Sequence, residues 1–260
     1  MKYDDKNSIG GRFKQNYEYP FKYKLPERMP VIIRLDGRAF HSLTKKCEKP
    51  FDNDFINLMD RTAIFLCKEI QNVQFAYIQS DEISLLLHNY KKLNSQSWLN
   101  NEIQKMCSIS AAMASSFFSV LLNVFIENTL KYGGNIIYPQ FDSRCFVLPE
   151  AEICNYFIWR QKDWERNSIQ MLAQSLFSYN ELHKKTNVEL QEMCFQKGKN
   201  WNDLDTSLKR GRCVIKKVPV DVESGDGIKI LNPEWKVDNE IPIFTQDKNY
   251  IEKYLEVEEE

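Results

Sequence analysis

Two apolar segments of this chain end next to acidic residues, and this feature constrains the fold most. Val31–Leu35 runs directly into Asp36-Gly37, and the apolar run 75–78 is soon followed by Asp81 and Glu82. Strands this apolar belong in a core, where carboxylates are costly unless a cation compensates them. A divalent metal ion is the natural compensation. The alternative is that the acids only mark turns, because Asp-Gly is a good turn dipeptide.

Length and composition indicate one large globular domain, or one domain with an appendage. The chain has 260 residues, of which 43% are hydrophobic, so it can bury a sizeable core. Its seven cysteines never stand at C-x-x-C spacing, so neither a zinc module nor a disulfide framework is indicated. We find no run of roughly 18 to 20 apolar residues and no secretion signal. We therefore expect a soluble, cytoplasmic protein without a membrane partner, with an organelle as the alternative location.

Positive charge is clustered along the chain, although the formal net charge is only −1. Four of the last five residues are glutamates, which offsets basic groups elsewhere. Such basic runs are usually solvated faces, but several in one chain also suit a polyanionic partner. The runs lie at positions 45–49, 184–185, 197–199, 209–212 and 216–217.

The order of predicted elements favours an α+β fold with a ferredoxin-like βαββαβ core. Apolar periodicity and caps predict strand, helix, strand, strand, helix, strand, which is the order of that unit. The predicted elements are a strand Val31–Leu35, a helix capped by Asp52 or Asn53, a hairpin of Val73–Ile78 with Ile83–Leu87, a helix over 101–131 that stops at Gly133-Gly134, and a strand Arg144–Leu148.

We expect three parts of the chain: an irregular N-terminal arm (1–30), the catalytic core (31–150) and a C-terminal lobe packed on it (151–260). The lobe is predicted to hold helices over 151–179 and 187–193. It is also predicted to hold a two-stranded ribbon of 214–222 with 227–231, turning at 224–227.

The predicted topology brings the acids together. In this unit the sheet order is 4-1-3-2, so the first strand lies antiparallel beside the third. Asp36 ends the first strand where Asp81 and Glu82 begin the third, so all three acids meet at one edge of the sheet. This convergence favours a metal site over a pair of turns.

Paired carboxylates favour phosphoryl or nucleotidyl transfer. Such pairs bind Mg²⁺, which usually also bridges to substrate phosphates, and two ions can serve the attacking and leaving oxygens. Gly37 would allow close approach of a phosphate or metal to the backbone. The basic residues Arg38, His41, Lys45, Lys46 and Lys49 either clamp a triphosphate or only solvate the loop. A P-loop motif is absent, so a P-loop NTPase is not indicated.

Three segments closely resemble the tRNA-His guanylyltransferase family of 3′-to-5′ nucleotide-adding polymerases: Arg34–His41, Lys49-Pro50 with Asp52, and Ala76–Glu82. Phe141–Cys145 and Trp159–Gln161 are similar to later motifs of that family. The resemblance implies a polymerase-type palm fold, a nucleotidyltransferase activity on tRNA, and two Mg²⁺ ions. It also implies ATP, GTP and other NTPs as substrates, and a homotetramer by analogy.

The resemblance also implies roles for individual residues. Asp36, the Gly37 carbonyl and Asp81 would hold the two Mg²⁺ ions, with Glu82 supporting the catalytic site. The incoming nucleotide would be lined by Gly37, Arg38, Ala39, Phe40, His41, Lys49, Asp52 and Ser80, with Lys105 and Arg144 near a triphosphate. We expect tRNA contacts from Arg160, Arg166, Asn167, Lys209, Arg210 and Arg212.

One segment departs from the eukaryotic guanylyltransferases. Where those carry His-Ile-Asn-Asn-Leu-Tyr-Asn-Thr, this chain has Asp163–Gln170, with Glu165 in place of the His. The segment is more similar to the guanylyltransferase-like branch, which implies template-dependent repair of tRNA 5′ ends after activation with ATP. The alternative is addition of the extra 5′ G to tRNA-His. More remote alternatives are a palm-type nucleotide cyclase and a non-catalytic RNA-binding protein.

Overall fold

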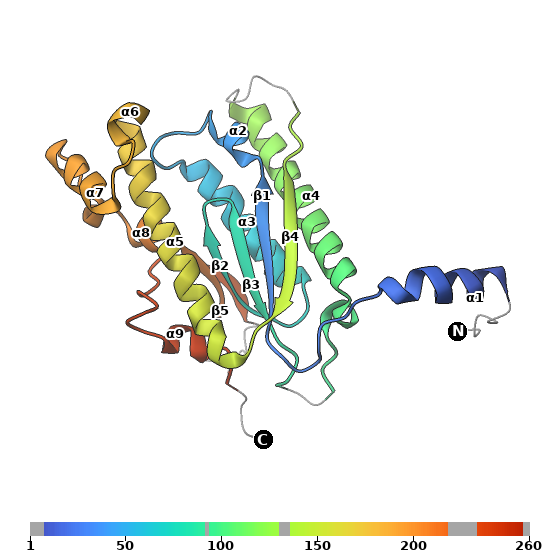
Figure 1. The fold of residues 1–260 in the computed structure, drawn as a ribbon. Helices are drawn as coiled ribbons and strands as arrows, with labels where there is room; N and C mark the ends of the chain where they lie inside the picture. The colour runs from blue at the N-terminus through green and yellow to red at the C-terminus, as the bar shows by residue number, and fades with distance from the viewer. Residues whose placement is uncertain (1–7, 92–93, 130–135, 218–232, 257–260) are drawn as a thin grey trace, which may run out of the picture.

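An antiparallel sheet covered by helices on both faces forms the body of the protein (Figure 1). The computed structural model describes residues 8–91, 94–129, 136–217 and 233–256. Within these residues the sheet has six strands in the order β4-β1-β3-β2-β5-β6. Their bounds are β1 Val31–Arg38, β2 Val73–Gln79, β3 Glu82–Leu87, β4 Gln140–Val147, β5 Arg212–Lys217 and β6 Glu234–Asp238.

The first four strands have the expected order, with β1 between β3 and β4 and antiparallel to both. The helices between them are α2 (Phe40–Thr44), α3 (Asn53–Glu69) and α4 (Ile103–Thr129). Asp52 caps α3, because its carboxylate accepts a hydrogen bond of 2.9 Å from the Phe55 amide. The hairpin of β2 and β3 is also as predicted, with Ser80 and Asp81 as its turn.

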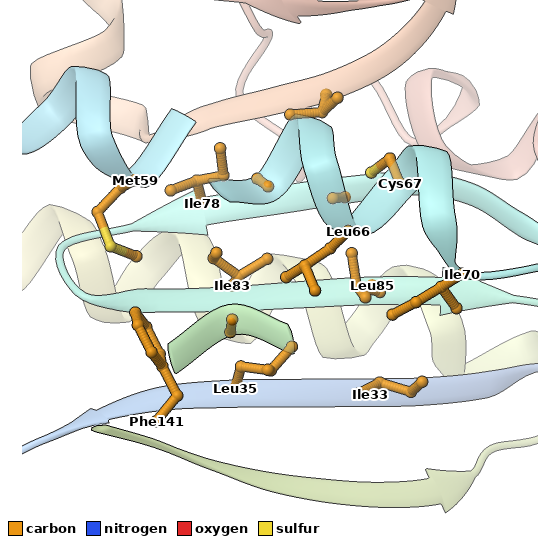
Figure 2. Packing of buried hydrophobic residues seen from close by; sticks show 14 of the residues in the cluster. Ile33, Leu35, Met59, Leu66, Cys67, Ile70, Ile78, Ile83, Leu85 and Phe141 are labelled. Atoms are coloured by element: carbon orange, nitrogen blue, oxygen red, sulfur yellow. The ribbon is translucent and has the colours of Figure 1, made fainter. Parts of the chain in front are cut away.

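Both faces of β1 are buried, which explains its continuous apolar run. Figure 2 shows Ile33 and Leu35 of β1 on the same side as Ile83 of β3, facing Met59 and Leu66 of α3. None of these five side chains is exposed to solvent. The residue before Ile33, Ile32, points to the other face of the sheet and packs with Phe75 of β2 under the long helix α5 (Glu150–Leu176).

Helix α4 packs on the sheet along one narrow stripe. Its buried residues recur every fourth position: Met106, Ser110, Ala114, Phe118 and Leu122. The hydroxyls of Ser110 and Ser143 on β4 lie 2.8 Å apart, as expected where small residues let a strand approach closely. The predicted stop at Gly133-Gly134 lies outside the described residues.

By length and composition, the segment Ile103–Val124 of α4 could cross a membrane, although only 22% of its most apolar window is buried in this fold. The segment contains no run of roughly 18 to 20 consecutive apolar residues, in agreement with the sequence analysis, and it meets the criterion through its mean hydropathy. Small residues in the middle of the helix break up the run of large apolar side chains, but they do not lower the mean hydropathy enough to exclude it. Here α4 lies against β4 and α3 as one helix of the fold.

Residues 9–21 of the N-terminal arm are helical, which was not expected, whereas residues 22–30 are irregular as predicted. Helical turns α1 (Ile9–Phe13), η1 (Lys14–Glu18) and η2 (Tyr19–Phe21) follow one another, and Ser8 caps the first of them. The first proline of the arm, Pro20, stands in the last of these turns, so no proline interrupts the helix before it. Figure 1 shows the arm extending away from the sheet.

The C-terminal part continues the sheet. β5 pairs with β2, and β6 pairs with β5. The ribbon was expected to use 227–231 as its second strand, but Glu234–Asp238 takes that place. Residues 218–232, with the predicted turn at 224–227, lie outside the described residues. The remaining helical elements are η3 (Trp98–Asn101), α6 (Tyr179–Leu182), α7 (Asn187–Gln196), η4 (Trp201–Asp203), α8 (Thr206–Arg210) and α9 (Asn249–Glu252).

Candidate active site

Asp36 and Asp81 meet where β1 ends and the β2–β3 turn begins. The Gly37 amide donates a hydrogen bond of 3.1 Å to the Asp81 carbonyl, which joins the two acidic segments directly. Ser80 adopts a positive φ of 46°, as a two-residue hairpin turn requires. Residues 45 positions apart in the sequence thus lie side by side, as the predicted topology required.

Three acids form a row across the sheet. Asp36 is paired in register with Glu82 on β3 and with Asp142 on β4, and paired residues of antiparallel strands point to the same face. Sequence reasoning assigned no role to Asp142. The signal was available, because antiparallel pairing of the fourth strand with the first places the Phe141–Cys145 motif opposite Asp36.

A second row of side chains lies two residues before Asp36 along β1, and this row carries positive charge. Arg34 is paired in register with Arg144 on β4, and both residues are on the same face as Asp36. The pKa of Asp36 is raised, first by burial and then by the charge of Asp142, while the charges of Arg144 and Arg34 lower it. The arginines therefore offset part of the cost of gathering carboxylates here.

Asp81 is the most perturbed of the acids. Its pKa is raised to about 6, mainly by burial and in smaller part by the charge of Asp36. Among the described residues, none forms an ion pair with Asp81. A partly buried carboxylate that lies beside another and has no cationic partner is a ready ligand for a cation.

The Glu82 carboxylate is paired with an arginine and is therefore not free to join Asp36 and Asp81. Arg160 of α5 donates two hydrogen bonds to its carboxylate, from Nε at 2.8 Å and from a terminal nitrogen at 2.7 Å. Both side chains are buried. Burial raises the pKa of Glu82, and the charge of Arg160 lowers it. Glu82 therefore supports the site by positioning α5 against β3, and a direct catalytic role is not favoured.

The donor set fits a cation that also binds substrate. Among the described residues, no group of three or more His, Cys, Asp and Glu stands close enough to hold an ion alone. Two carboxylates with the Gly37 carbonyl leave positions open for phosphate oxygens, which is how Mg²⁺ is usually bound in phosphoryl-transfer sites.

The loop after Asp36 is shaped by Phe40. An added Cβ at Gly37 would lie 2.5 Å from the Phe40 ring, so only glycine fits there. The Phe40 ring is buried against Phe118 and Phe141, with ring centroids 5.4 and 4.9 Å away. Phe40 therefore reaches a nucleotide only through its backbone. The exposed residues of the loop are Arg38, Ala39 and His41, and Arg38 donates a 2.7 Å hydrogen bond to Gln140.

A cavity of about 240 Å³ opens beside Ser80, and Lys49 and Asp52 also line it. We call it the nucleotide cavity, because the resemblance assigns Lys49, Asp52 and Ser80 to nucleotide binding. Asp52 was expected to contact the nucleotide, but its two carboxylate oxygens accept hydrogen bonds from the amides of Phe55 and Glu48. Its role in the structure is to shape the cavity wall.

The far wall of the nucleotide cavity comes from α5, which sequence reasoning did not foresee. Trp164, Met171 and Gln174 line it, together with the buried residue Arg212. Their spacing in the sequence is that of an ordinary amphipathic helix, so no local signal marked them.

The two residues expected near a triphosphate lie far apart. Arg144 is exposed beside the acid row and pairs with Asp142 at 3.2 Å. Lys105 is on the first turn of α4, beside Met106, which lines a small pocket together with Val31 at the start of β1. Val31 and Asp36 are at opposite ends of that strand, so within one chain Lys105 does not join the acid pair.

Some of the predicted tRNA-contacting residues lie on the surface, and others are buried. Arg160 and Arg212 were wrongly expected on the surface: Arg160 binds Glu82, and Arg212 binds Asp60 at 2.6 Å. The others are accessible to some degree. Arg166 pairs with Asp163, Asn167 is half-buried on α5, and Lys209 and Arg210 donate to the carbonyls of Asn202 and Ile241.

Comparison with known proteins agrees with this geometry. The family model for tRNAHis guanylyltransferase matches residues 11–149, which include every acid of the row. A probable tRNA(His) guanylyltransferase of Dictyostelium discoideum is 30% identical over 230 residues, covering 82% of this chain and 86% of the relative.

Two solved structures match nearly the whole chain. A bacterial tRNA(His) guanylyltransferase (Thg1)-like protein in complex with ATP is 41% identical with a TM-score of 0.84, covering 96% of this chain and 100% of that one. A structure of the same description in complex with GTP is 40% identical with a TM-score of 0.79, covering 96% and 99%. The chain belongs to the tRNA-His guanylyltransferase family and is a tRNA nucleotidyltransferase.

Proposed function

We propose that this enzyme extends the 5′ end of tRNA in the 3′-to-5′ direction, choosing each nucleotide by pairing with the opposite strand. The observation that carries the proposal is the junction of Asp36 and Asp81 through the Gly37 amide, directly beside the nucleotide cavity. The similar bacterial proteins described as bound to ATP and to GTP support a site that accepts both nucleotides.

Asp36, Asp81 and the Gly37 carbonyl would hold two Mg²⁺ ions in this proposal. Bound there, the ions would lower the pKa of an attacking hydroxyl and neutralise charge on the leaving group. The site suits Mg²⁺ because the two carboxylates lie close together and neither has an ion-pair partner among the described residues.

The remaining residues bind and orient the substrates. In the proposed reaction ATP transfers AMP to the 5′-monophosphate of the tRNA and releases pyrophosphate. The 3′-hydroxyl of the incoming NTP then attacks that activated phosphate, loses its proton and displaces AMP. Lys49 and Ser80 would hold the nucleotide within its cavity, and Arg144, exposed beside the acid row, would face the phosphates. The polymerase-type palm is the proposed framework for this placement, with α5 closing one side of the cavity.

Repair and guanine addition can be separated by one assay. A tRNA lacking its first nucleotide is incubated with ATP and each NTP in turn, with the opposing base varied. Template-dependent repair predicts incorporation of the complementary nucleotide only. Incorporation of guanine whatever the opposing base would instead indicate the tRNA-His activity, and reaction of NTP without RNA would indicate a cyclase.

We also propose that copies of the chain assemble through α4, as a homotetramer. Its outward side chains Ile109, Val120 and Val124 are 38%, 63% and 55% exposed. A stripe of apolar residues on a long helix is usually covered in a soluble protein. Sedimentation of the wild type and of Val120→Glu tests this assembly. A lower molar mass for the variant than for the wild type supports the proposal. A monomer for both proteins contradicts it.

A further inference from the structure

A second cavity lies at the end of α5, where α6 and α7 turn back toward that helix. Its volume is about 550 Å³, in the range of sites that hold a nucleotide-sized ligand. We call it the α5–α7 cleft. The residues that matter for the argument are Gln174, Phe177, Tyr179, His183, Lys184 and Lys185, all of which line it.

The aromatic side of the cleft is open and fixed in place. Tyr179 is 78% exposed, and its ring centroid lies 5.8 Å from that of His183. Two capping boxes hold the backbone on either side: Ser178 with Glu181, and Thr186 with Glu189. An exposed aromatic ring on a fixed backbone is a stacking surface that needs little ordering on binding.

The charged side of the cleft is basic. Lys184 and Lys185 line it, and the ammonium of Lys197 lies 5.7 Å from the Phe177 ring centroid. The nearby carboxylates of Glu181 and Glu189 accept hydrogen bonds from the caps, and Glu189 also pairs with Lys185 at 3.4 Å, which offsets part of the basic charge. Cations beside stacking aromatics suit the backbone and bases of single-stranded nucleic acid.

The cleft adjoins the nucleotide cavity. Gln174 lines both, and the nucleotide cavity reaches Ser80, next to Asp81. Figure 1 shows α6 and α7 at the same end of the molecule as the tip of β1. A strand that pairs with the incoming nucleotide and continues past Gln174 would enter the cleft.

We propose that the α5–α7 cleft binds the single-stranded 3′ extension that lies opposite the 5′ end of the RNA substrate. Tyr179 stacks on an unpaired base, and Lys184 and Lys185 contact its phosphates. The proposal rests on the proposed function, because only a reaction at a recessed 5′ end places unpaired 3′ nucleotides beyond the nucleotide cavity. It adds a subsite that would help the enzyme select RNA ends with an overhang.

The test is a binding measurement that needs no catalysis. Fluorescence anisotropy gives the Kd for an RNA hairpin with a short 3′ extension and for the same hairpin with a blunt end. We expect the wild type to prefer the extended hairpin by about tenfold, the effect of stacking one base. Tyr179→Ala should lose this preference without weakening blunt-end binding, and Tyr179→Trp should keep it.

A matched control is Tyr23→Ala, because Tyr23 is also exposed, at 63%, but lies on the N-terminal arm. It should keep the preference. The proposal is overturned if the wild type shows no preference or if Tyr179→Ala retains it. If the preference is present but no nucleotide is added in the repair assay, the proposed function fails while the cleft stands.

Discussion

Arg160 of α5 and Glu82 of β3 are joined by two hydrogen bonds of 2.8 and 2.7 Å in the interior of the protein. Glu82 directly follows Asp81, so the pair fixes the place where the hairpin turn enters its strand. Gln79 also donates to the Glu82 carboxylate, at 3.2 Å. The ion pair therefore supports the acid site by fixing the start of β3 against α5.

Removing the arginine should leave a buried, uncompensated carboxylate. We predict that Arg160→Met lowers the free energy of unfolding by about 3 to 5 kcal/mol, measured in urea. The double variant Arg160→Met with Glu82→Leu should recover much of this loss. Arg166→Met is the control, because Arg166 is exposed and should cost less than about 1 kcal/mol. Equal effects of the two single variants would contradict the supporting role.

Gly37 should tolerate no side chain. We predict that Gly37→Ala costs about 1 to 3 kcal/mol of stability, because its Cβ would meet the tightly packed Phe40 ring. The control is Gly10→Ala on the arm, where an added Cβ meets nothing within 4 Å. Thermal unfolding of both variants measures the difference. A Gly37→Ala protein as stable as the wild type would show that the ring is free to move.

The raised pKa of Asp81 predicts a dependence of stability on pH. The native carboxyl has a pKa of about 6, above the ordinary 3.8, so the folded state binds the proton more tightly than the unfolded state does. Stability therefore falls as pH rises from about 4 to 6, and the cost persists above that range.

Asp81→Asn should remove this cost. Without added metal, we predict that the variant is about 3 kcal/mol more stable than the wild type at pH 8, with little difference near pH 3.5. Asp142→Asn is the control, because that side chain is half-exposed and pairs with Arg144. A gain for Asp81→Asn that stays constant from pH 3.5 to 8 would contradict the role of its charge.

The sequence predicted the central part of the fold and the acid site for a physical reason. Continuous apolar runs identify strands buried on both faces, and the order of elements then determines which strand ends meet. Asp36 and Asp81 could be brought together on that basis alone, and the Gly37 hydrogen bond confirms it.

The side chains that bind distant partners could not be predicted in the same way. In the sequence Arg212 belongs to a basic run, but in the structure it is buried and paired with Asp60, which is 152 residues away. Arg160 is likewise hydrogen-bonded to Glu82, which is 78 residues away. A local pattern shows the charge of a residue and gives no information about which buried acid will pair with it.

The central claim is that Asp36 and Asp81 share a divalent cation, and the most direct test is metal binding. Electron paramagnetic resonance of Mn²⁺, with ATP present and RNA absent, gives the Kd for the protein-bound ion. We predict that Asp36→Asn and Asp81→Asn each weaken binding by at least about tenfold, whereas Asp142→Asn, beside the pair, has a smaller effect. Wild-type affinity in both Asp36→Asn and Asp81→Asn would contradict the claim.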